Sequence, residues 1–505
     1  MRFLKRFSLL TILAVLIPVA AQAQDVPDEQ FFLQQDISGK KNIGVIFFNE
    51  SIRALSPSLL FAFKSDEFED STSICKSIKD IGCKNSPKLG FDAHLAPCIN
   101  EGDVDCIEGL FANKDQDDVA VSGVFQELIP KIQANEFLGD KRSELPTGSS
   151  SGIWRIPGVI HQGGTDEYAV VAIKSGILVN KNGRFNPSEL AIGSFARSQL
   201  QVAIYPVTKV NKPNLRKIAI EFRKTATRGS SLSTIFSNGS DGCVLVDDGL
   251  CALRNGFPEG IDFGVKVRLS RQVNGWLHGR INEPVIDLTK STNSTSIEIS
   301  GRPMNVPVVS GWVPLEKFSK ADQKSLGLKS SDEGSYRTTS SSGLYAMQKL
   351  EIWNRLLGDK ATAYPSEWLF YTLSESELEG SNSCIANAKG LAGMVTSNST
   401  TYTGGPPTFS SKTQSLDYKI ASPHYLKDGS VFEGRYNLSI TSKVARCIYK
   451  FSNAPISASV SVVGGSGESR VATTAVSERK GWINLSVNGF TFSSPTVKVK
   501  LKQKK

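Results

Sequence analysis

The chain has 505 residues, and its 58 lysines and arginines against 49 aspartates and glutamates give a formal net charge of +9. Most of this excess lies at the two ends, between Arg2 and Arg6 and in the five lysines between Lys498 and Lys505, so the body is nearly neutral. The sequence has no basic stripe interleaved with aromatic residues, which argues against nucleic-acid binding, and its length predicts about two to four domains.

The N-terminus has the features of a secretory signal peptide, which we place at residues 1–23. A basic stretch from Arg2 to Arg6 precedes the apolar run Phe7 to Ala20, and Ala21-Gln22-Ala23 forms an A-x-A cleavage site. No cysteine follows to carry a lipid anchor, and no later apolar run reaches the ~18 residues of a membrane span. The sequence therefore predicts a protein that is secreted or held in the cell envelope, without a transmembrane span after cleavage.

All eight cysteines follow this leader, and an even number in an exported chain predicts four disulfides. Three pairs share the spacing C-x7-C, and the last two cysteines are left to each other across a long loop. The predicted pairs are Cys75–Cys83, Cys98–Cys106, Cys243–Cys251 and Cys384–Cys447. For the first four cysteines, Cys75–Cys106 with Cys83–Cys98 is an alternative. The spacing is not that of a zinc site and histidine is scarce, so no metal and no cofactor is predicted.

Residues 24–137 are predicted to form an N-terminal cysteine-bridged α/β segment. Ile43 to Phe48 is apolar apart from a glycine and predicts a buried strand, whereas Ser71 to Ile81 and Val104 to Ala112 are interpreted as short helices. A linker at 138–152, rich in serine and glycine at its end, is expected to follow this segment.

This linker contains one match to a catalytic motif. Gly148 to Gly152 fits the G-x-S-x-G pattern of serine hydrolases, and His161 to Gly164 resembles an oxyanion loop. A nucleophile elbow lies between a strand and a helix, and a Ser/Gly-rich stretch supplies neither. We therefore predict no catalytic residue here.

Residues 153–328 are predicted to form a central β-rich domain of the sandwich or barrel-like type, because short strand candidates recur between turn signals. Val265 to Arg271 alternates apolar with polar residues, and the Asn274-Gly275 pair that follows is a strong hairpin signal, since both turn positions need positive φ. A hairpin there places six residues on one face: Leu269, Arg271, Val273, Trp276, His278 and Arg280.

The far end of this predicted face is the candidate binding site. Arg271, Trp276, His278 and Arg280 combine an aromatic ring with up to three cationic groups, which suits an anionic or sugar-like ligand. The alternative is a sheet margin on which arginine side chains pack over a tryptophan without binding a ligand.

After a Ser/Thr-rich linker at 329–342, residues 343–359 predict a helix, because apolar residues recur at helical spacing and Gly358 is a natural C-cap. Residues 360–505 contain seven or more strand candidates and predict a C-terminal β-sandwich domain, immunoglobulin-like in general form. The chain is therefore expected to be mainly β with minor α, and to contain several disulfide-braced β-sandwich-type domains.

These features favour a non-enzymatic exported protein of the cell surface or envelope, whose β-domains bind a partner protein or a glycan. The alternative is a secreted hydrolase with an accessory β-sandwich domain. Glycosidase-type chemistry needs only a pair of carboxylates, which the chain has in plenty, whereas its histidines number only four. A pocket with two facing carboxylates, or with His278 beside an acid, would favour the hydrolase.

Overall fold

The computed structural model describes most of the chain beyond its N-terminus. The described residues are 41–47, 57–63, 71–84, 86–114, 119–131, 135–180, 190–192, 199–211, 243–247, 249–339, 342–373, 375–452, 456–463, 469–470, 473–492 and 496–503. The predicted signal peptide, residues 1–23, lies outside them. Within these ranges, no helix combines the length and apolar character needed to cross a membrane.

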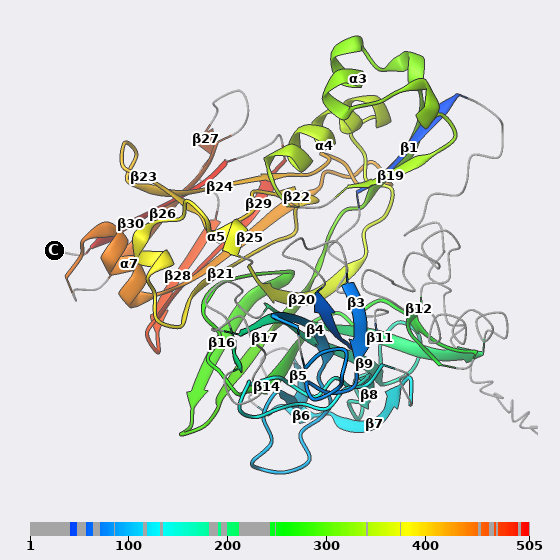
Figure 1. Ribbon diagram of the computed structural model, residues 1–505. Coiled ribbons are helices and arrows are strands. Elements are labelled where there is room, and N and C mark those ends of the chain that lie inside the picture. The colour runs from blue at the N-terminus through cyan, green and yellow to red at the C-terminus, as the bar shows by residue number, and fades with distance from the viewer. Residues whose placement is uncertain are drawn as a thin grey trace, which may run out of the picture.

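Two large sheets are linked into a closed system, and most of their strands lie in the lower part of the molecule in Figure 1. The first sheet contains, in spatial order, β3 (Ser71–Cys75), β2 (Leu59–Phe63), β4 (Lys88–His94), β9 (Glu167–Asn180), β11 (Gln199–Asn211), β20 (Ser366–Thr372), β15 (Gly275–Gly279), β21 (Leu391–Ser397), β25 (Glu433–Thr441), β29 (Trp482–Thr491) and β28 (Thr473–Arg479). The second contains β6 (Val121–Ser122), β5 (Cys106–Lys114), β14 (Ile261–Leu269), β17 (Thr295–Asn305) and β16 (Ile281–Lys290).

Shorter strands complete this closed system. They are β7 (Val124–Ile129), β8 (Ser151–Arg155) and β10 (Leu190–Ile192) beside β9, and the hairpin of β12 (Cys243–Asp247) and β13 (Leu250–Arg254) beside β11. In β14, Val265 and Val267 are buried between the two sheets while Lys266 and Arg268 point outward, which is the period of a strand with one buried face.

A small three-stranded sheet and two helices form a separate unit at the top of Figure 1. Here β1 (Asn42–Phe47) lies between β18 (Val309–Pro314) and β19 (Tyr336–Thr339). The helical elements are η2 (Leu315–Lys317), α3 (Lys320–Leu326), η3 (Ser330–Asp332) and α4 (Leu344–Leu357). Leu350 and Trp353 of α4 pack with the apolar residues of β1, and Gly358 ends the helix in the left-handed conformation at φ 81°.

The C-terminal third forms a sandwich. A second C-terminal sheet contains β22 (Thr401–Tyr402), β24 (Ser415–Ala421), β30 (Thr496–Gln503), β26 (Ile456–Val463) and β27 (Ser469–Arg470), with β23 (Thr408–Ser410) beside β24. Its apolar face packs on β25 and β29 of the first large sheet. The helices α5 (Glu375–Leu378), α6 (Ser383–Ala386) and α7 (Ser442–Tyr449) lie at its margin. The fold is thus mainly β with minor α, as predicted; the immunoglobulin-like form of the last domain stays a prediction.

The predicted domain boundaries differ from the observed pairing in the first half. The described residues of the predicted segment 24–137 do not form an α/β unit of their own, because β4 pairs with β9 and β5 pairs with β14. The helices predicted at 71–81 and 104–112 are wrong: these residues form β3, β5 and the loops beside them. Their apolar residues alternate ambiguously over so short a length, and strand partners far along the chain decide the outcome.

All four predicted disulfides are present, and each C-x7-C pair is closed on itself. The alternative Cys75–Cys106 with Cys83–Cys98 is therefore excluded. Cys384 on α6 is joined to Cys447 on α7, which ties the start of the C-terminal sandwich to its middle. Disulfides of this number are typical of proteins that fold in oxidising compartments.

Candidate binding surface

The hairpin predicted at Asn274-Gly275 is wrong. The strand before it, β14, lies between β5 and β17, so both of its edges are already hydrogen-bonded. The strand after it, β15, belongs to the other sheet and lies between β20 and β21. Gly275 does have a positive φ of 88°, but the chain uses it to cross from one sheet to the other.

The four predicted binding residues are not all brought together. Trp276, His278 and Arg280 alternate along β15 and its end, and their exposed fractions are 0%, 1% and 0%. Trp276 belongs to the core of the C-terminal sandwich, whereas its neighbour Leu277 faces the core between the large sheets. Arg271 lies apart, with its side chain 49% exposed and paired with Glu144. The predicted solvent-facing cluster is therefore split between the interior and one edge of the closed sheets.

That edge is built from two disulfide loops of the same construction. In the loop Cys75–Cys83, the Asp80 carboxylate accepts hydrogen bonds from the backbone N–H groups of Lys76 (2.6 Å) and Ser77 (3.2 Å). These bonds hold the pKa of Asp80 below its usual value, because they stabilise the charged form. The carboxylate and the disulfide together close the loop into one fixed turn.

The loop Cys98–Cys106 repeats this arrangement. Asp103 accepts from the backbone N–H groups of Ile99 (2.9 Å) and Asn100 (2.7 Å), and its pKa is lowered for the same reason. In both loops the aspartate stands five residues after the first cysteine, so C-x4-D-x2-C is the sequence signal that could have found them. The third C-x7-C pair has the same signature but closes the β12–β13 hairpin instead.

The two loops leave the same edge of the first large sheet. β3 and β4 are both antiparallel to β2 between them, so they run in the same direction and end at the same side. A turn at residues 137–148 joins them there, since the Leu138 N–H donates to the Lys76 carbonyl at 2.7 Å and Ser149 bridges to His94. We call the two loops and this turn the disulfide edge.

The disulfide edge exposes three large aliphatic side chains. Ile81 is 86% exposed, Ile99 is 89% exposed and Leu138 is 70% exposed. Ile78, in the same loop as Ile81, is buried in the core at 2% exposure and anchors the loop. Because these loops are fixed in place, their apolar side chains cannot fold back onto the protein surface. Exposed apolar side chains of this kind mark a surface suited to contact with another molecule.

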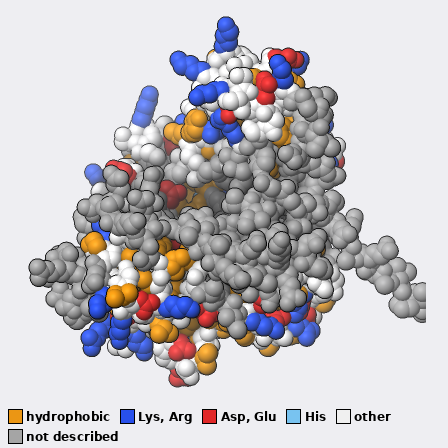
Figure 2. All heavy atoms as spheres, turned by 45° about the vertical axis from the view of Figure 1, so that its right-hand side comes forward, with side chains coloured by type: hydrophobic (Ala, Val, Ile, Leu, Met, Phe, Trp, Pro, Cys, Tyr) orange, Lys and Arg blue, Asp and Glu red, His pale blue; other side chains and the backbone are white. Residues whose placement is uncertain are grey.

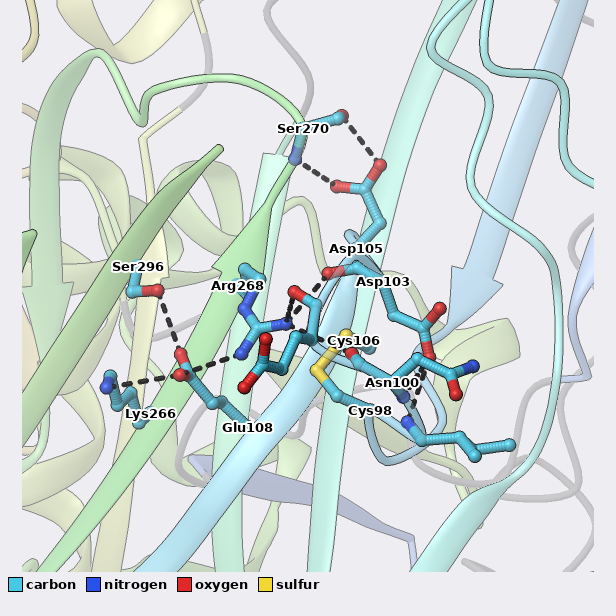
Figure 3. Close-up of a disulfide and its surroundings, with 12 residues drawn as sticks. Cys98, Asn100, Asp103, Asp105, Cys106, Glu108, Lys266, Arg268, Ser270 and Ser296 are labelled. Carbon is cyan, nitrogen blue, oxygen red and sulfur yellow. Dashed lines mark hydrogen bonds and ion pairs between the residues drawn. A yellow bond between two sulfur atoms is a disulfide. The ribbon is translucent and has the colours of Figure 1, made fainter. Parts of the chain in front are cut away.

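The loop Cys98–Cys106 is fastened to the second large sheet by charged groups, as Figure 3 shows. Nη1 of Arg268 donates to the carbonyl oxygens of Asn100 (3.3 Å), Glu101 (2.5 Å) and Asp103 (3.2 Å), and Nη2 donates to Glu108 at 2.9 Å. Three carbonyls on one guanidinium leave the loop little freedom to move.

A buried ion pair joins the same loop to the first large sheet. Lys174 of β9 and Asp105 approach to 2.6 Å, and both side chains are only 4% exposed. Asp105 also accepts from the backbone N–H and the hydroxyl of Ser270, the residue that follows β14. The disulfide edge is therefore a rigid platform connected to both large sheets.

The serines of the G-x-S-x-G match, Ser150 and its neighbour Ser151, are buried. The segment Gly148–Gly152 runs into β8, with no helix after it, and Ser150 is fully buried. Ser151 bonds the Nδ1 of His94 at 2.7 Å, but both side chains are at most 2% exposed. Within the described ranges, no three His, Cys, Asp or Glu side chains gather in a way that could hold a metal ion.

His161 is also enclosed. Its Nε2–H donates to the Val207 carbonyl at 3.0 Å, and its Nδ1 accepts from the Gly163 N–H at 3.0 Å. Burial lowers the pKa of His161 to about 4, so the ring is neutral at pH 7. The His161 ring is neutral, buried and held by two hydrogen bonds, so its role is structural. The interpretation of His161 to Gly164 as an oxyanion loop is not supported.

This low pKa predicts acid sensitivity. An unfolded histidine titrates near pH ~6.5, so the unfolded state binds the proton first and the free energy of unfolding falls as pH drops below ~6.5. We expect His161 to lower that free energy by about 2 kcal/mol between pH 7 and pH 5. Urea unfolding of the His161→Gln variant should lack this part of the pH dependence; equal slopes in both proteins would contradict the assignment.

No protein family model, no curated protein and no solved structure matches this chain. On the face shown in Figure 2, cationic and acidic side chains of the described residues are interspersed.

Proposed function

We propose that this chain is an exported, non-enzymatic protein of the cell surface or envelope, and that its disulfide edge binds a partner protein. The observation that carries the proposal is the pair of disulfide loops that hold Ile81 and Ile99 outward. The signal-peptide features at the N-terminus and the four disulfides support export.

The chemistry of the edge favours a protein over a glycan. Aromatic rings offer flat apolar faces that can stack on sugars, whereas the large apolar groups exposed at this edge, Ile81, Ile99 and Leu138, are all aliphatic. Burying one such side chain against a partner is worth about 1.5–3 kcal/mol. Because the loops are already fixed by disulfides and aspartates, little conformational entropy is lost when the partner binds.

The state of the histidines speaks against a hydrolase that uses histidine, whereas glycosidase-type chemistry needs carboxylates alone. His94, His161 and His278 are at most 3% exposed, and the partly exposed His424 is bonded to Asp359. These side chains are enclosed or engaged in the fold, whereas the aliphatic groups of the disulfide edge are accessible.

The test is attachment to isolated envelopes of the producing cells, measured by sedimentation. Ile81→Asn, Ile99→Asn and Leu138→Asn should each weaken attachment about tenfold or more, since each removes a buried anchor of roughly 1.5–3 kcal/mol. Val285→Asn is the matched control, because Val285 is 62% exposed on β16, away from the disulfide edge.

The result also separates the two partner classes. Protease treatment of the envelopes should abolish attachment, whereas periodate oxidation of glycans should leave it unchanged. Undiminished attachment of a variant that carries all three substitutions, with circular dichroism like that of the parent, would rule out the disulfide edge as the binding surface. Loss after periodate alone would replace the protein partner by a glycan.

A further inference from the structure

A fully buried arginine lies where the large sheets meet the C-terminal sandwich. Arg280 is 0% exposed, and its Nη1 donates to the carbonyl oxygens of Ser397 (2.6 Å) and Ser399 (2.8 Å). Its guanidinium carbon lies 5.0 Å from the centre of the Tyr402 ring. Nε and Nη2 are buried and have no hydrogen-bond partner among the residues that the structure describes.

The other partly buried arginines of the described chain have carboxylate partners. Nitrogens of Arg254, Arg268 and Arg446 lie 2.7–2.9 Å from the carboxylates of glutamates, at side-chain exposures of 15–16%. Arg280 is more deeply buried than any of these three, yet no described carboxylate pairs with it. Its guanidinium thus contacts two carbonyl oxygens and a tyrosine ring, none of which carries a full negative charge.

The unused edge has a definite shape. Nε and Nη2 point to the same side of a guanidinium and form the fork that receives both oxygens of a carboxylate. This chain uses that fork elsewhere: Nε and Nη2 of Arg155 each donate to one carboxylate oxygen of Asp166 at 2.9 Å. Arg280 has the same two donors, and no carboxylate of the described chain receives them.

A buried charge without a counter-charge is strongly destabilising, because the folded state loses its hydration without gaining an ionic partner. The contact with the Tyr402 ring offsets only part of this loss. The residues that hold Nη1 also carry hydroxyls, and Ser397 Oγ and Ser399 Oγ lie 2.9 Å apart. One hydroxyl donates to the other, so a second O–H remains for a further acceptor.

We propose that Arg280 binds a small carboxylate anion of the size of formate or acetate through its Nε–Nη2 fork. The two oxygens accept one N–H each, and the negative charge neutralises the guanidinium. Because the side chain is fully enclosed, the anion is a free small molecule taken up as the chain folds, and not a side chain of a partner protein. The site is independent of the disulfide edge and of the function proposed for it.

The probe is radiolabelled sodium acetate. Disulfide-intact protein is unfolded in urea, refolded in labelled acetate and passed through a desalting column. About one acetate per chain should stay with the parent protein, and Arg280→Lys, which keeps the charge but loses the fork, should retain less than a tenth of that. Arg254→Lys is the matched control and should retain as much acetate as the parent.

A second measurement covers the case in which Arg280→Lys does not fold. The urea midpoint of the parent protein should rise steadily with the logarithm of acetate concentration at constant ionic strength, because only the native state binds the anion. Chloride should have no such effect. Equal stabilisation by chloride, stabilisation by phosphate but not acetate, or the same retained acetate in parent and Arg280→Lys would each overturn the proposal.

Discussion

Replacing Lys174 by methionine should lower the free energy of unfolding by about 3–5 kcal/mol, because the substitution leaves Asp105 as a buried carboxylate without its cation. Both side chains are 4% exposed, so solvent cannot replace the lost partner. Ser270 would still donate two hydrogen bonds to Asp105, but hydrogen bonds from neutral groups do not neutralise the charge. Urea denaturation with the disulfides intact measures the loss.

A matched control lies on the neighbouring strand. Lys209 pairs with Glu127 at 3.0 Å and with Glu167 at 2.9 Å, but its side chain is 30% exposed. Lys209→Met should cost less than about 1 kcal/mol, because water screens the charges it leaves. Adding Asp105→Asn to Lys174→Met should recover part of the stability. If Lys174→Met and Lys209→Met were equally stable, burial would not be the cause.

Removing the Cys384–Cys447 disulfide with Cys384→Ser and Cys447→Ser should destabilise the C-terminal sandwich by about 4 kcal/mol in the chain-entropy model. The two cysteines are 63 residues apart, so their bond removes much of the freedom of the unfolded chain. The separation is only 8 residues for Cys243–Cys251, and its removal should cost roughly 2.5 kcal/mol.

The loss of the two disulfides has to be measured in the full chain and not in an isolated C-terminal fragment. Within residues 360–505, β20 lies between β11 and β15, and Trp276 of β15 enters the core of the sandwich. An isolated fragment would lose those partners as well as the disulfide. Urea transitions of the two double-serine variants in the full chain are the measurement. An equal loss in both would mean that loop length does not set the contribution of these bonds.

The buried surroundings of Arg280 were the part of the molecule that the sequence predicted least well. Six polar residues from Thr396 to Thr401 would ordinarily be assigned to a solvent-exposed loop, yet none is more than 2% exposed. Arg280 accounts for much of this, since it binds two of their carbonyl oxygens from a strand 117 residues earlier in the chain. A polar run shows where hydrogen bonds are needed, but not which distant donor supplies them.

Local features of this protein were readable from the sequence. The C-x7-C spacing predicted three disulfides, but for the first four cysteines it left Cys75–Cys106 with Cys83–Cys98 open. The helical spacing of Leu344, Met347, Leu350, Trp353 and Leu357 predicted α4. Met347, Leu350 and Trp353 lie on its buried face, whereas Leu344 is 53% exposed. The alternation in Val265 to Arg271 likewise identified β14 as a strand with one buried face. Each of these features arises from contacts within a few residues.

Strand partners were decided only by the tertiary structure. Asn274-Gly275 has the residues of a hairpin turn, but β5 and β17 occupy both edges of β14, so β15 has to pair in the other sheet. β1 pairs with strands more than 260 residues away. Backbone hydrogen bonds between strands are the same for almost any sequence, so the choice among distant partners depends on how the whole core packs.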